Sequence, residues 1–228
     1  MSIEPIAVFR SPLGDKFGVP RQSGLAPSLD GRIELTGRFR NPDALRGMEG
    51  FDYIWLLWSF DRNPYNGFSP TVRPPRLGGN ERIGVFASRS PFRPNGIGIS
   101  SVRVESVDFE HCAINVTGAD LADGTPIIDI KPYVEYTDAH IGIRNGFVDT
   151  NEWTDLRVSI SEDILESSAF PADKVQSLKE ILALDPRPAY HGNPAKVYGM
   201  DFAGFDIKFK VNGNNLTVVA IFPIKQTR

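Results

Sequence analysis

The chain has 228 residues, of which 41% are hydrophobic and 23% charged, and its formal net charge is −3. This length and composition fit a globular protein with one large domain, or one domain and a small appendage. The one cysteine, Cys112, excludes an internal disulfide and a cysteine-cluster metal site, and the three histidines lack ligand spacing, so we expect no metal.

The sequence also bears on where the protein works. No apolar run approaches the roughly 18 residues of a membrane span, and the first four residues lack the basic start of a signal peptide. We therefore expect no membrane contact and a cytoplasmic location. Because the chain is acidic overall, contact with RNA would require a local basic patch.

Short β-prone runs separated by Gly, Pro and Asn occupy the first 140 residues, a pattern typical of an antiparallel barrel or sandwich. The run 54–60 is apolar on both faces, which predicts a central strand buried on two sides. The segment 41–47 predicts a short capped helix that ends at a glycine. The predicted strands are 6–9, 32–36, 53–58, 83–87, 100–107, 112–116 and 126–131.

The pattern changes after about Tyr136. Apolar residues at helical spacing follow Pro171 and predict a helix over about 172–184. Alternation on both sides of the turn Asn212-Gly213 predicts a hairpin over about 204–222. We therefore expect a mainly β protein, α+β overall, with a β-barrel-like domain over 1–140 and a small α+β domain over 141–228.

Arginines are concentrated between Arg62 and Arg93. This segment holds six arginines, no lysine and one acid, Glu81, so its local charge is near +5. A guanidinium binds phosphates in a bidentate way and stacks on bases, which favours a polyanionic ligand. A solvated face that pairs with acids elsewhere is the alternative. Rigid Pro and permissive Gly residues between the arginines favour shaped functional loops over that alternative.

The loop 87–100 carries the densest group of such residues. Pro91 and Pro94 fix the backbone around Phe92 and Arg93, and the glycines that follow allow close approach to a ligand. Asn95 offers both an amide donor and an acceptor. The loop is therefore suited to a carboxylate, a ribose or the edge of a base.

Three further clusters resemble this loop in kind. A cation stands beside an amide in the segment 20–22. The segment 121–126 is either an ordinary turn or a loop that holds a nucleoside. Asp129 and Lys131 lie two residues apart on one face of a predicted strand, where they form either a structural ion pair or the wall of a site.

These motifs together resemble one family, the bacterial tRNA threonylcarbamoyladenosine N6-methyltransferases of the TrmO type. The resemblance covers nearly the full length and is weakest over about 140–180. The matching segments, in chain order, are Pro20-Arg21-Gln22, Thr71-Val72-Arg73-Pro74-Pro75-Arg76, Ser88 to Asn95, Asp123-Gly124-Thr125-Pro126, Asp129 to Tyr133, and Asp185 to Tyr190.

The resemblance implies methyl transfer from S-adenosylmethionine to N6 of threonylcarbamoyladenosine at position 37 of tRNA. It also implies a homodimer with a β-barrel core and a cofactor near the subunit interface. The absence of a strand-GxGxxG-helix unit agrees with a fold other than the Rossmann type. The implied cofactor contacts are Pro20, Arg21, Gln22, Phe60, Asp61, Arg89, Ile99, Leu121, Asp123, Gly124 and Thr125. Some relatives carry histidine in place of Asp61, so we expect contact there through backbone or water.

The acceptor nitrogen must lose a proton, and we hypothesise that Asn95 or Asp129 orients the N6-H or the carbamoyl group. Arg89 would meet the cofactor carboxylate, and Arg93 the threonine carboxylate or a phosphate. Core packing is the alternative role for the aromatic residues. The predicted substrate contacts are Phe92, Lys131, Tyr133, Arg187 and Tyr190. Two other functions remain open, a non-catalytic RNA-binding module and a cofactor-dependent enzyme that acts on a small nucleotide.

Overall fold

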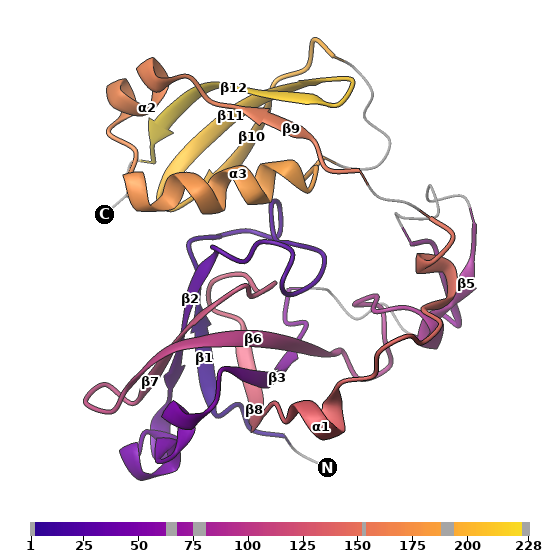
Figure 1. Ribbon diagram of the computed structural model, residues 1–228, viewed down its shortest axis with the longest axis vertical. Coiled ribbons are helices and arrows are strands. Elements are labelled where there is room, and N and C mark those ends of the chain that lie inside the picture. The colour runs from indigo at the N-terminus through magenta and orange to yellow at the C-terminus, as the bar shows by residue number, and fades with distance from the viewer. Residues whose placement is uncertain (1–2, 63–67, 75–80, 152–153, 188–193, 225–228) are drawn as a thin grey trace.

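The computed structural model describes residues 3–62, 68–74, 81–151, 154–187 and 194–224. These residues form a barrel and, on one end of it, a smaller body of sheet and helices (Figure 1). The strands of the barrel are β1 (Ala7–Arg10), β2 (Asp30–Leu35), β3 (Tyr53–Ser59), β6 (Ile97–Asp108), β7 (Ala113–Thr117) and β8 (Pro126–Pro132).

The barrel closes in the order β1-β2-β7-β6-β3-β8, with β8 returning to β1, and each neighbouring pair is antiparallel. Alternate side chains of each strand fill the interior, such as Ile54, Leu56 and Trp58 of β3. A closed antiparallel barrel confirms the predicted fold class and differs from the parallel sheet of a Rossmann enzyme.

The antiparallel order decides which loops meet. Because β1, β3 and β7 run in one direction and β2, β6 and β8 in the other, the segments 11–29, 60–96 and 118–125 all emerge at the same end. We call this end the mouth of the barrel. It faces the smaller body in Figure 1, whereas α1 (Glu135–Asp138) and the β6–β7 turn lie at the opposite end.

The smaller body has a four-stranded sheet in the order β10-β11-β12-β9, in which β9 runs parallel to β12 and the other neighbours are antiparallel. A 3-10 turn over 172–174 leads directly into α3, within the range predicted as helix. The elements of this body are β9 (Arg157–Ser159), α2 (Glu162–Ser168), α3 (Val175–Ala183), β10 (Tyr198–Phe202), β11 (Phe205–Asn212) and β12 (Asn215–Pro223).

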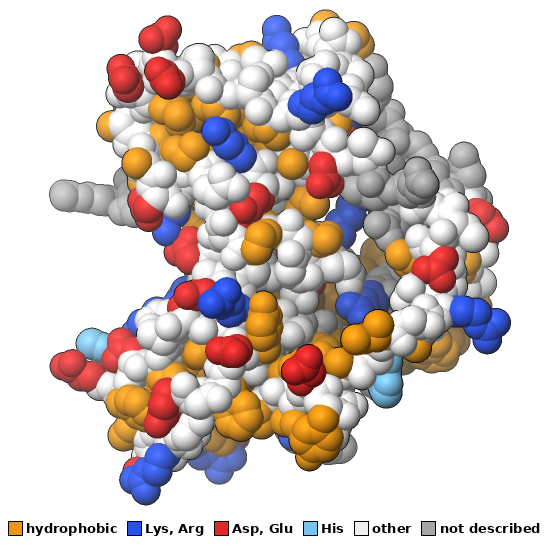
Figure 2. All heavy atoms as spheres, viewed as in Figure 1, with side chains coloured by type: hydrophobic (Ala, Val, Ile, Leu, Met, Phe, Trp, Pro, Cys, Tyr) orange, Lys and Arg blue, Asp and Glu red, His pale blue; other side chains and the backbone are white. Residues whose placement is uncertain are grey.

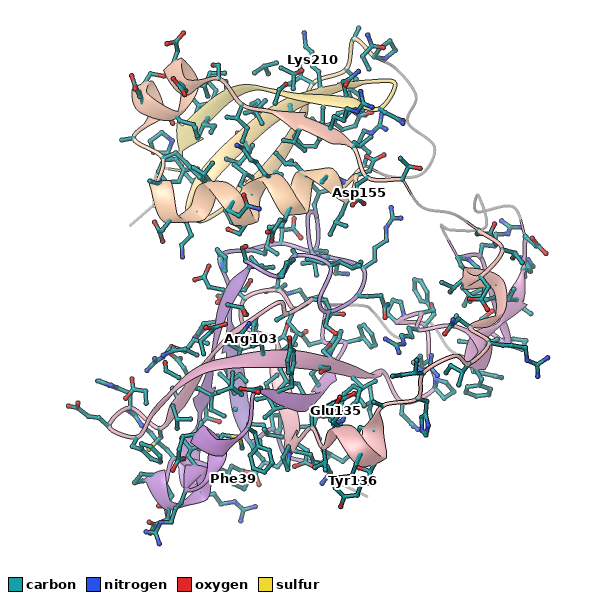
Figure 3. The ribbon with its side chains drawn as sticks, viewed as in Figure 1. Phe39, Arg103, Glu135, Tyr136, Asp155 and Lys210 are labelled. Atoms are coloured by element: carbon teal, nitrogen blue, oxygen red, sulfur yellow. The ribbon has the colours of Figure 1, made fainter. Side chains whose placement is uncertain are left out.

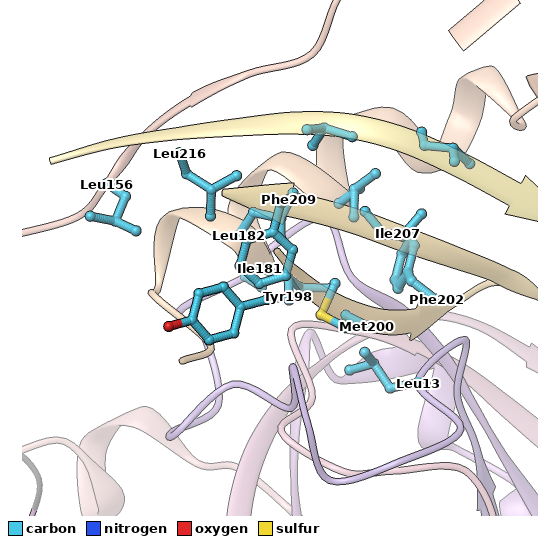
Figure 4. Packing of buried hydrophobic residues seen from close by; sticks show 14 of the residues in the cluster. Leu13, Leu156, Ile181, Leu182, Tyr198, Met200, Phe202, Ile207, Phe209 and Leu216 are labelled. Carbon is cyan, nitrogen blue, oxygen red and sulfur yellow. The ribbon is translucent and has the colours of Figure 1, made fainter. Parts of the chain in front are cut away.

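One apolar cluster joins the two bodies. Leu13, Ala26 and Leu29 of the mouth belong to the same buried cluster as α3 and β10, and Leu13 lies next to Met200 in Figure 4. Burial of apolar area in this cluster therefore holds α3 over the mouth.

Two local predictions were wrong, those for 83–87 and for the burial of β3, and the short capped helix predicted over 41–47 was confirmed as a 3-10 helix. The run 83–87 is a strand only as β5 (Ile83–Gly84), which pairs with β4 (Thr71–Val72), and its remainder is a 3-10 helix. The segment 41–47 forms a 3-10 helix over Pro42–Leu45, capped as predicted by the Asn41 side chain, which accepts from the Asp43 amide at 3.0 Å. β3 is buried on one face only, because its other face is the outside of a closed barrel.

Candidate functional site at the mouth of the barrel

Arg62 holds two loops of the mouth together. Its Nη1 donates to the carbonyl of Gly14 at 2.8 Å, and its Nη2 donates to the carbonyl of Asp123. Lys16 in turn donates to the carbonyl of Arg62. The loops 11–29 and 118–125 are therefore fixed to the end of β3 by charge-assisted hydrogen bonds.

Two predicted cofactor residues meet directly. Nη1 of Arg89 donates to Oε1 of Gln22 at 2.5 Å, across 67 positions of sequence. The neighbouring Ser23 hydroxyl accepts from the amide of Ser101 at 3.2 Å, which attaches the same loop to β6. The segments that carry Gln22, Arg89 and Ile99 are thus adjacent. Arg89 and Ile99 are exposed and accessible to a ligand.

The loop 121–125 is a preformed turn. Gly124 has a φ of +80°, and its amide donates to the carbonyl of Phe9. Leu121 is buried in the core of the barrel, and the Thr125 hydroxyl donates to the carbonyl of Ala122 at 2.8 Å. Asp123 accepts from the amide of Ser11 at 3.1 Å. The side chains of Leu121 and Thr125 are therefore occupied inside the fold, and a ligand would meet the backbone of this loop.

Asp120, next to this loop, was missed by the sequence analysis. The Ser100 hydroxyl donates to its Oδ1 at 2.5 Å, and Nε1 of Trp58 donates to the Ser100 oxygen at 2.9 Å. Burial raises the pKa of Asp120 to about 6, against the lowering effects of the Ser100 hydrogen bond and the Arg89 charge. Carboxyl groups with a strongly shifted pKa are common at functional sites. The shift depends on the surroundings that the fold creates, so the sequence alone did not indicate it.

Phe60 and Asp61 follow β3 into the mouth. The amide of Phe60 donates to the carbonyl of Gly96 at 2.8 Å, and its ring meets that of Trp58 edge-on with centroids 4.3 Å apart. Asp61 is exposed. The backbone bond ties the end of β3 to the predicted ligand loop.

In that loop, Phe92 and Asn95 are exposed, while Arg93 donates to the carbonyl of Ser88 at 2.6 Å and lies 6.0 Å from the ring centroid of Phe86. Phe86 is 72% exposed and stacks on Phe68, with centroids 6.4 Å apart. This aromatic pair was also missed. In Figure 2, basic side chains lie along the hollow between the barrel and the lobe that carries β5.

The register places Asp129 in the same row of the barrel as Ile99, one of the predicted cofactor contacts. Leu57 of β3 pairs with Ile99 of β6 on one side and with Asp129 of β8 on the other, so the three form one row across the barrel. Two strand spacings separate the ends of this row, about 10 Å. Asp129 and Lys131 form an ion pair of 2.9 Å on the outer surface, so the structural pair left open by the sequence is present.

Other predicted residues lie apart from this group. Tyr133 is at the opposite end of β8, where its ring packs against Trp55 at a centroid distance of 5.4 Å. Arg187 is held by Asp185, with Nε to Oδ1 and Nη2 to Oδ2 each at 2.8 Å. Tyr190 and Arg76 lie outside the described residues.

A cavity of about 390 Å³ lies where the mouth meets α3. Pro20 and Arg21 form part of its wall, together with Asp185 and Pro186 of the smaller body. Arg89 and Asp120 are not among its lining residues, so this cavity does not include the contact between Arg89 and Gln22.

The described part of the chain offers neither a metal site nor a membrane-spanning helix. No group of three or more His, Cys, Asp or Glu residues there is arranged to hold a metal ion. No helix in those ranges is long and apolar enough to cross a membrane.

Comparisons with known proteins agree on one family. Residues 8–139 match the tRNA-methyltransferase O N-terminal domain, and residues 154–224 match the TrmO C-terminal domain. A tRNA (adenine(37)-N6)-methyltransferase of Escherichia coli is 37% identical over 96% of this chain and 97% of its own length. A putative S-adenosylmethionine-dependent methyltransferase of Pseudomonas aeruginosa is 40% identical over 90% of each chain. The crystal structure of TrmO from Pseudomonas aeruginosa superposes with a TM-score of 0.80 at 32% identity, over 97% of each chain.

Proposed function

The chain belongs to the tRNA-methyltransferase O family, and we propose that it transfers a methyl group from S-adenosylmethionine to N6 of adenosine 37 in tRNA. We further propose that the acceptor is threonylcarbamoyladenosine at that position. One observation carries the proposal: Gln22, Arg89, Ile99 and the 121–125 loop, distant in sequence, converge at the mouth of the barrel.

The residues at the mouth fit the chemistry of the cofactor. Arg89 is a cation for its carboxylate, and the carboxyl groups of Asp120 and Asp123 suit its ammonium group or ribose hydroxyls. Phe60 and the exposed Ile99 offer apolar surface to an adenine ring. When bound, S-adenosylmethionine supplies an electrophilic methyl group on a sulfonium. The bond formed is N6–CH₃, the bond broken is S–CH₃, and the N6 proton must leave.

The chain's own contribution is to hold the acceptor in line and to receive its proton. Positioning of this kind contributes up to about 7–11 kcal/mol of barrier reduction in enzymes. We propose that Asn95, exposed in the loop before β6, orients the N6-H or the carbamoyl group. Asp129, in the same row as Ile99, is the alternative group proposed to orient the N6-H or the carbamoyl group. We propose that Arg93, already bound to the Ser88 carbonyl, contributes its remaining donors to the threonine carboxylate or a phosphate.

The substrate's anticodon loop would contact the exposed surface beside this group. Phe92, Lys131, Arg73 and Arg82 are its proposed contacts, and unpaired bases stack readily on exposed aromatic rings. Tyr133 and Arg187 stay predicted contacts, although each already has an internal partner.

We also propose that the protein acts as a homodimer in the cytoplasm. Figure 3 shows Tyr136 on α1, where it is 89% exposed, and Ile141 shortly after it is 97% exposed. Large apolar side chains that are this exposed are typical of a protein interface. Analytical ultracentrifugation of the wild type and of Ile141→Asp tests this, since a dimer built on this surface dissociates in the variant.

Methyl transfer to defined tRNA tests the proposed reaction. Labelled S-adenosylmethionine is incubated with threonylcarbamoylated tRNA and with the same tRNA lacking the modification, and the product is located by nuclease digestion and mass spectrometry. We expect label on N6 of residue 37 in the modified tRNA only. Label at position 37 of both tRNAs would show that the enzyme methylates adenosine 37 without requiring the threonylcarbamoyl group.

Arg89→Ala tests the site. We expect loss of cofactor binding in calorimetry with an unchanged circular dichroism spectrum, and an undiminished affinity would exclude Arg89 as a cofactor contact. A non-catalytic RNA-binding module would bind tRNA with steep salt dependence but not the cofactor. An enzyme for small nucleotides would bind the cofactor and ignore tRNA.

A further inference from the structure

The cavity where the mouth meets α3 is formed by two segments that are far apart in the sequence. One wall is the continuous run 15–21, and the other consists of residues at the end of α3 and directly after it, Ile181, Leu184, Asp185 and Pro186. Its volume of about 390 Å³ lies within the range of small-molecule sites, about 300–1,000 Å³, which often lie between domains. The cavity therefore has the size and the location of a ligand site.

The loop wall of the cavity is held in place by the rest of the chain. Lys16 donates to the carbonyl of Arg62, and the amide of Val19 donates to the carbonyl of Lys16 at 3.2 Å, which closes a turn. Gly18 has a φ of +96°, and a methyl group added to it would collide with Sδ of Met200. The backbone of this wall therefore lies directly against β10, and contacts within the chain set its shape.

The opposite wall is a fixed turn after α3. Asp185 has a φ of +50°, and its carboxylate accepts from the amide of Arg187 at 3.3 Å and from Nε and Nη2 of the same arginine, each at 2.8 Å. The amide of Asp185 donates to the carbonyl of Leu182 at 3.2 Å. A residue other than glycine in the left-handed region is uncommon and persists only where its surroundings maintain it. Both walls of the cavity are therefore formed without a ligand.

The lining of the cavity combines apolar and charged side chains. The apolar ones are Phe17, Val19, Pro20, Ile181, Leu184 and Pro186. Asp15 accepts from the amide of Lys16 at 2.5 Å and Asp185 accepts from Arg187, so both carboxylates already have donors in the chain, while Arg21 is exposed. Apolar walls fit the faces of a flat ring, and a guanidinium binds phosphate. A nucleotide matches both parts, whereas a simple anion would make no use of the apolar walls.

The chain connects this cavity to the proposed cofactor contacts. Pro20 and Arg21 line the cavity, and the next residue, Gln22, accepts from Arg89. Bases of an RNA loop can be splayed apart, and the nucleotide next to residue 37 is joined to it by a single phosphodiester. We propose that the cavity binds a nucleotide adjacent to residue 37 of tRNA, with its base against the apolar walls and its phosphate toward Arg21. The inference rests on the proposed function, because only that function brings residue 37 to the cofactor at Arg89.

Three RNAs test the inference on the full-length protein. The first is an anticodon stem-loop that carries threonylcarbamoyladenosine, and the other two lack the base at one or the other neighbour of residue 37 but keep the backbone. We expect one of the two abasic RNAs to bind about tenfold more weakly than the intact RNA in fluorescence anisotropy at fixed salt, because its base no longer fills the cavity. Equal affinity for all three RNAs overturns the inference.

Leu184→Phe fills part of the cavity from the α3 side and keeps the wall apolar. It is expected to bind the intact RNA about tenfold more weakly than the wild type, and to bind the weaker abasic RNA as the wild type does, because both changes remove the same contact. Val19→Phe fills the cavity from the loop wall and is expected to give the same result. Losses that multiply when variant and abasic RNA are combined overturn the inference.

Leu165→Phe is the matched control, because Leu165 is also half-buried in the smaller body but does not line the cavity. It is expected to bind all three RNAs as the wild type does. Calorimetry with S-adenosylmethionine is expected to give the wild-type affinity for Leu184→Phe. Weaker cofactor binding by Leu184→Phe would show that the cavity holds part of the cofactor, and this result overturns the inference.

The outcomes separate the two proposals. If the wild type methylates N6 of the intact RNA and binds both abasic RNAs equally well, the inference is wrong and the proposed function stands. If the wild type binds S-adenosylmethionine but methylates none of the RNAs, the proposed function is wrong, and the inference that rests on it fails with it.

Discussion

The indole of Trp58 lies against Gly98, and no side chain fits between them: a methyl group on Gly98 would collide with the six-membered ring of the indole. Both residues point into the barrel on neighbouring strands, in direct register. The close approach keeps Nε1 of Trp58 on the Ser100 hydroxyl, and through it orders Asp120. A glycine in the middle of a strand therefore supports the site at the mouth.

Gly98→Ala is expected to displace the indole. The crowding is expected to lower the free energy of unfolding by about 1–3 kcal/mol in urea denaturation. Because the Trp58–Ser100–Asp120 chain is broken, cofactor affinity is expected to fall as well. Gly50→Ala is the control, since nothing lies within 4 Å of its added methyl group and its φ is ordinary. Unchanged stability and affinity in Gly98→Ala would show that the indole readily moves aside.

Arg62→Ala is expected to loosen the mouth. The guanidinium donates to the carbonyls of two loops, and hydrogen bonds to a charged group contribute about 1.5–3 kcal/mol. We expect faster amide hydrogen exchange at Asp123 and Gly124, with protection elsewhere in the barrel retained. Arg62→Lys is expected to recover only part of the protection, because an ammonium group lacks the planar fork.

Arg103→Ala serves as the control for the two Arg62 variants. Its guanidinium is mostly exposed and lies 3.5 Å from Glu105, a surface contact of the kind that contributes little. Equal exchange rates at Asp123 in Arg62→Ala and Arg103→Ala would contradict a specific role for Arg62.

The barrel could be predicted from alternation along single strands, but its closure could not. The residues of β3 were expected to be buried on both faces because both faces are apolar. The structure buries only the inner face, since the outer face of a closed barrel is only partly covered. The end of the strand predicted at 83–87 turned into a 3-10 helix, although Val85 is buried as a strand residue would be.

Only part of the site could be predicted, because its contacts join residues that are brought together by the fold. Gln22 and Arg89 were named separately, and the structure joins them. Asp120 carried no sequence signal, because its importance comes from the burial of Ser100 and from a strand register that only the fold creates. Arg187 was expected to face a phosphate, and its pairing with Asp185 two positions away shows how local partners satisfy a guanidinium.

Phe86→Ala is expected to weaken tRNA binding by about tenfold, because base–aromatic stacking contributes about 1–3 kcal/mol. Phe86 stacks on Phe68 and lies beside Arg93, an arrangement suited to an unpaired base. Fluorescence anisotropy at fixed salt measures the affinity, while cofactor affinity is expected to stay unchanged. Phe109→Ala, an exposed aromatic residue at the far end of the barrel, is the control.

A different result would give another role to the surface that carries Phe68 and Phe86. If Phe86→Ala leaves tRNA affinity intact but converts a dimer into monomers in sedimentation, the aromatic pair is a subunit contact and does not bind RNA.

The negative charge of Asp108 is expected to stabilise the fold, and the negative charge of Asp120 to destabilise it. The Arg32 hydrogen bond lowers the pKa of Asp108 to about 2, whereas burial raises the pKa of Asp120 to about 6. Asp108 therefore stabilises the fold above pH 4, and this contribution is lost as the pH falls toward 2. The buried charge of Asp120 destabilises the fold above pH 6, and this penalty disappears as the pH falls toward 4.

Urea denaturation of the two asparagine variants across this pH range measures both effects. At pH 7, Asp108→Asn is expected to be less stable than the wild type, and Asp120→Asn at least as stable as the wild type. At pH 4 the difference between Asp120→Asn and the wild type is expected to vanish, while that of Asp108→Asn persists. An Asp120→Asn protein that is less stable at pH 7 yet binds the cofactor normally would show that Asp120 serves the fold and not the site.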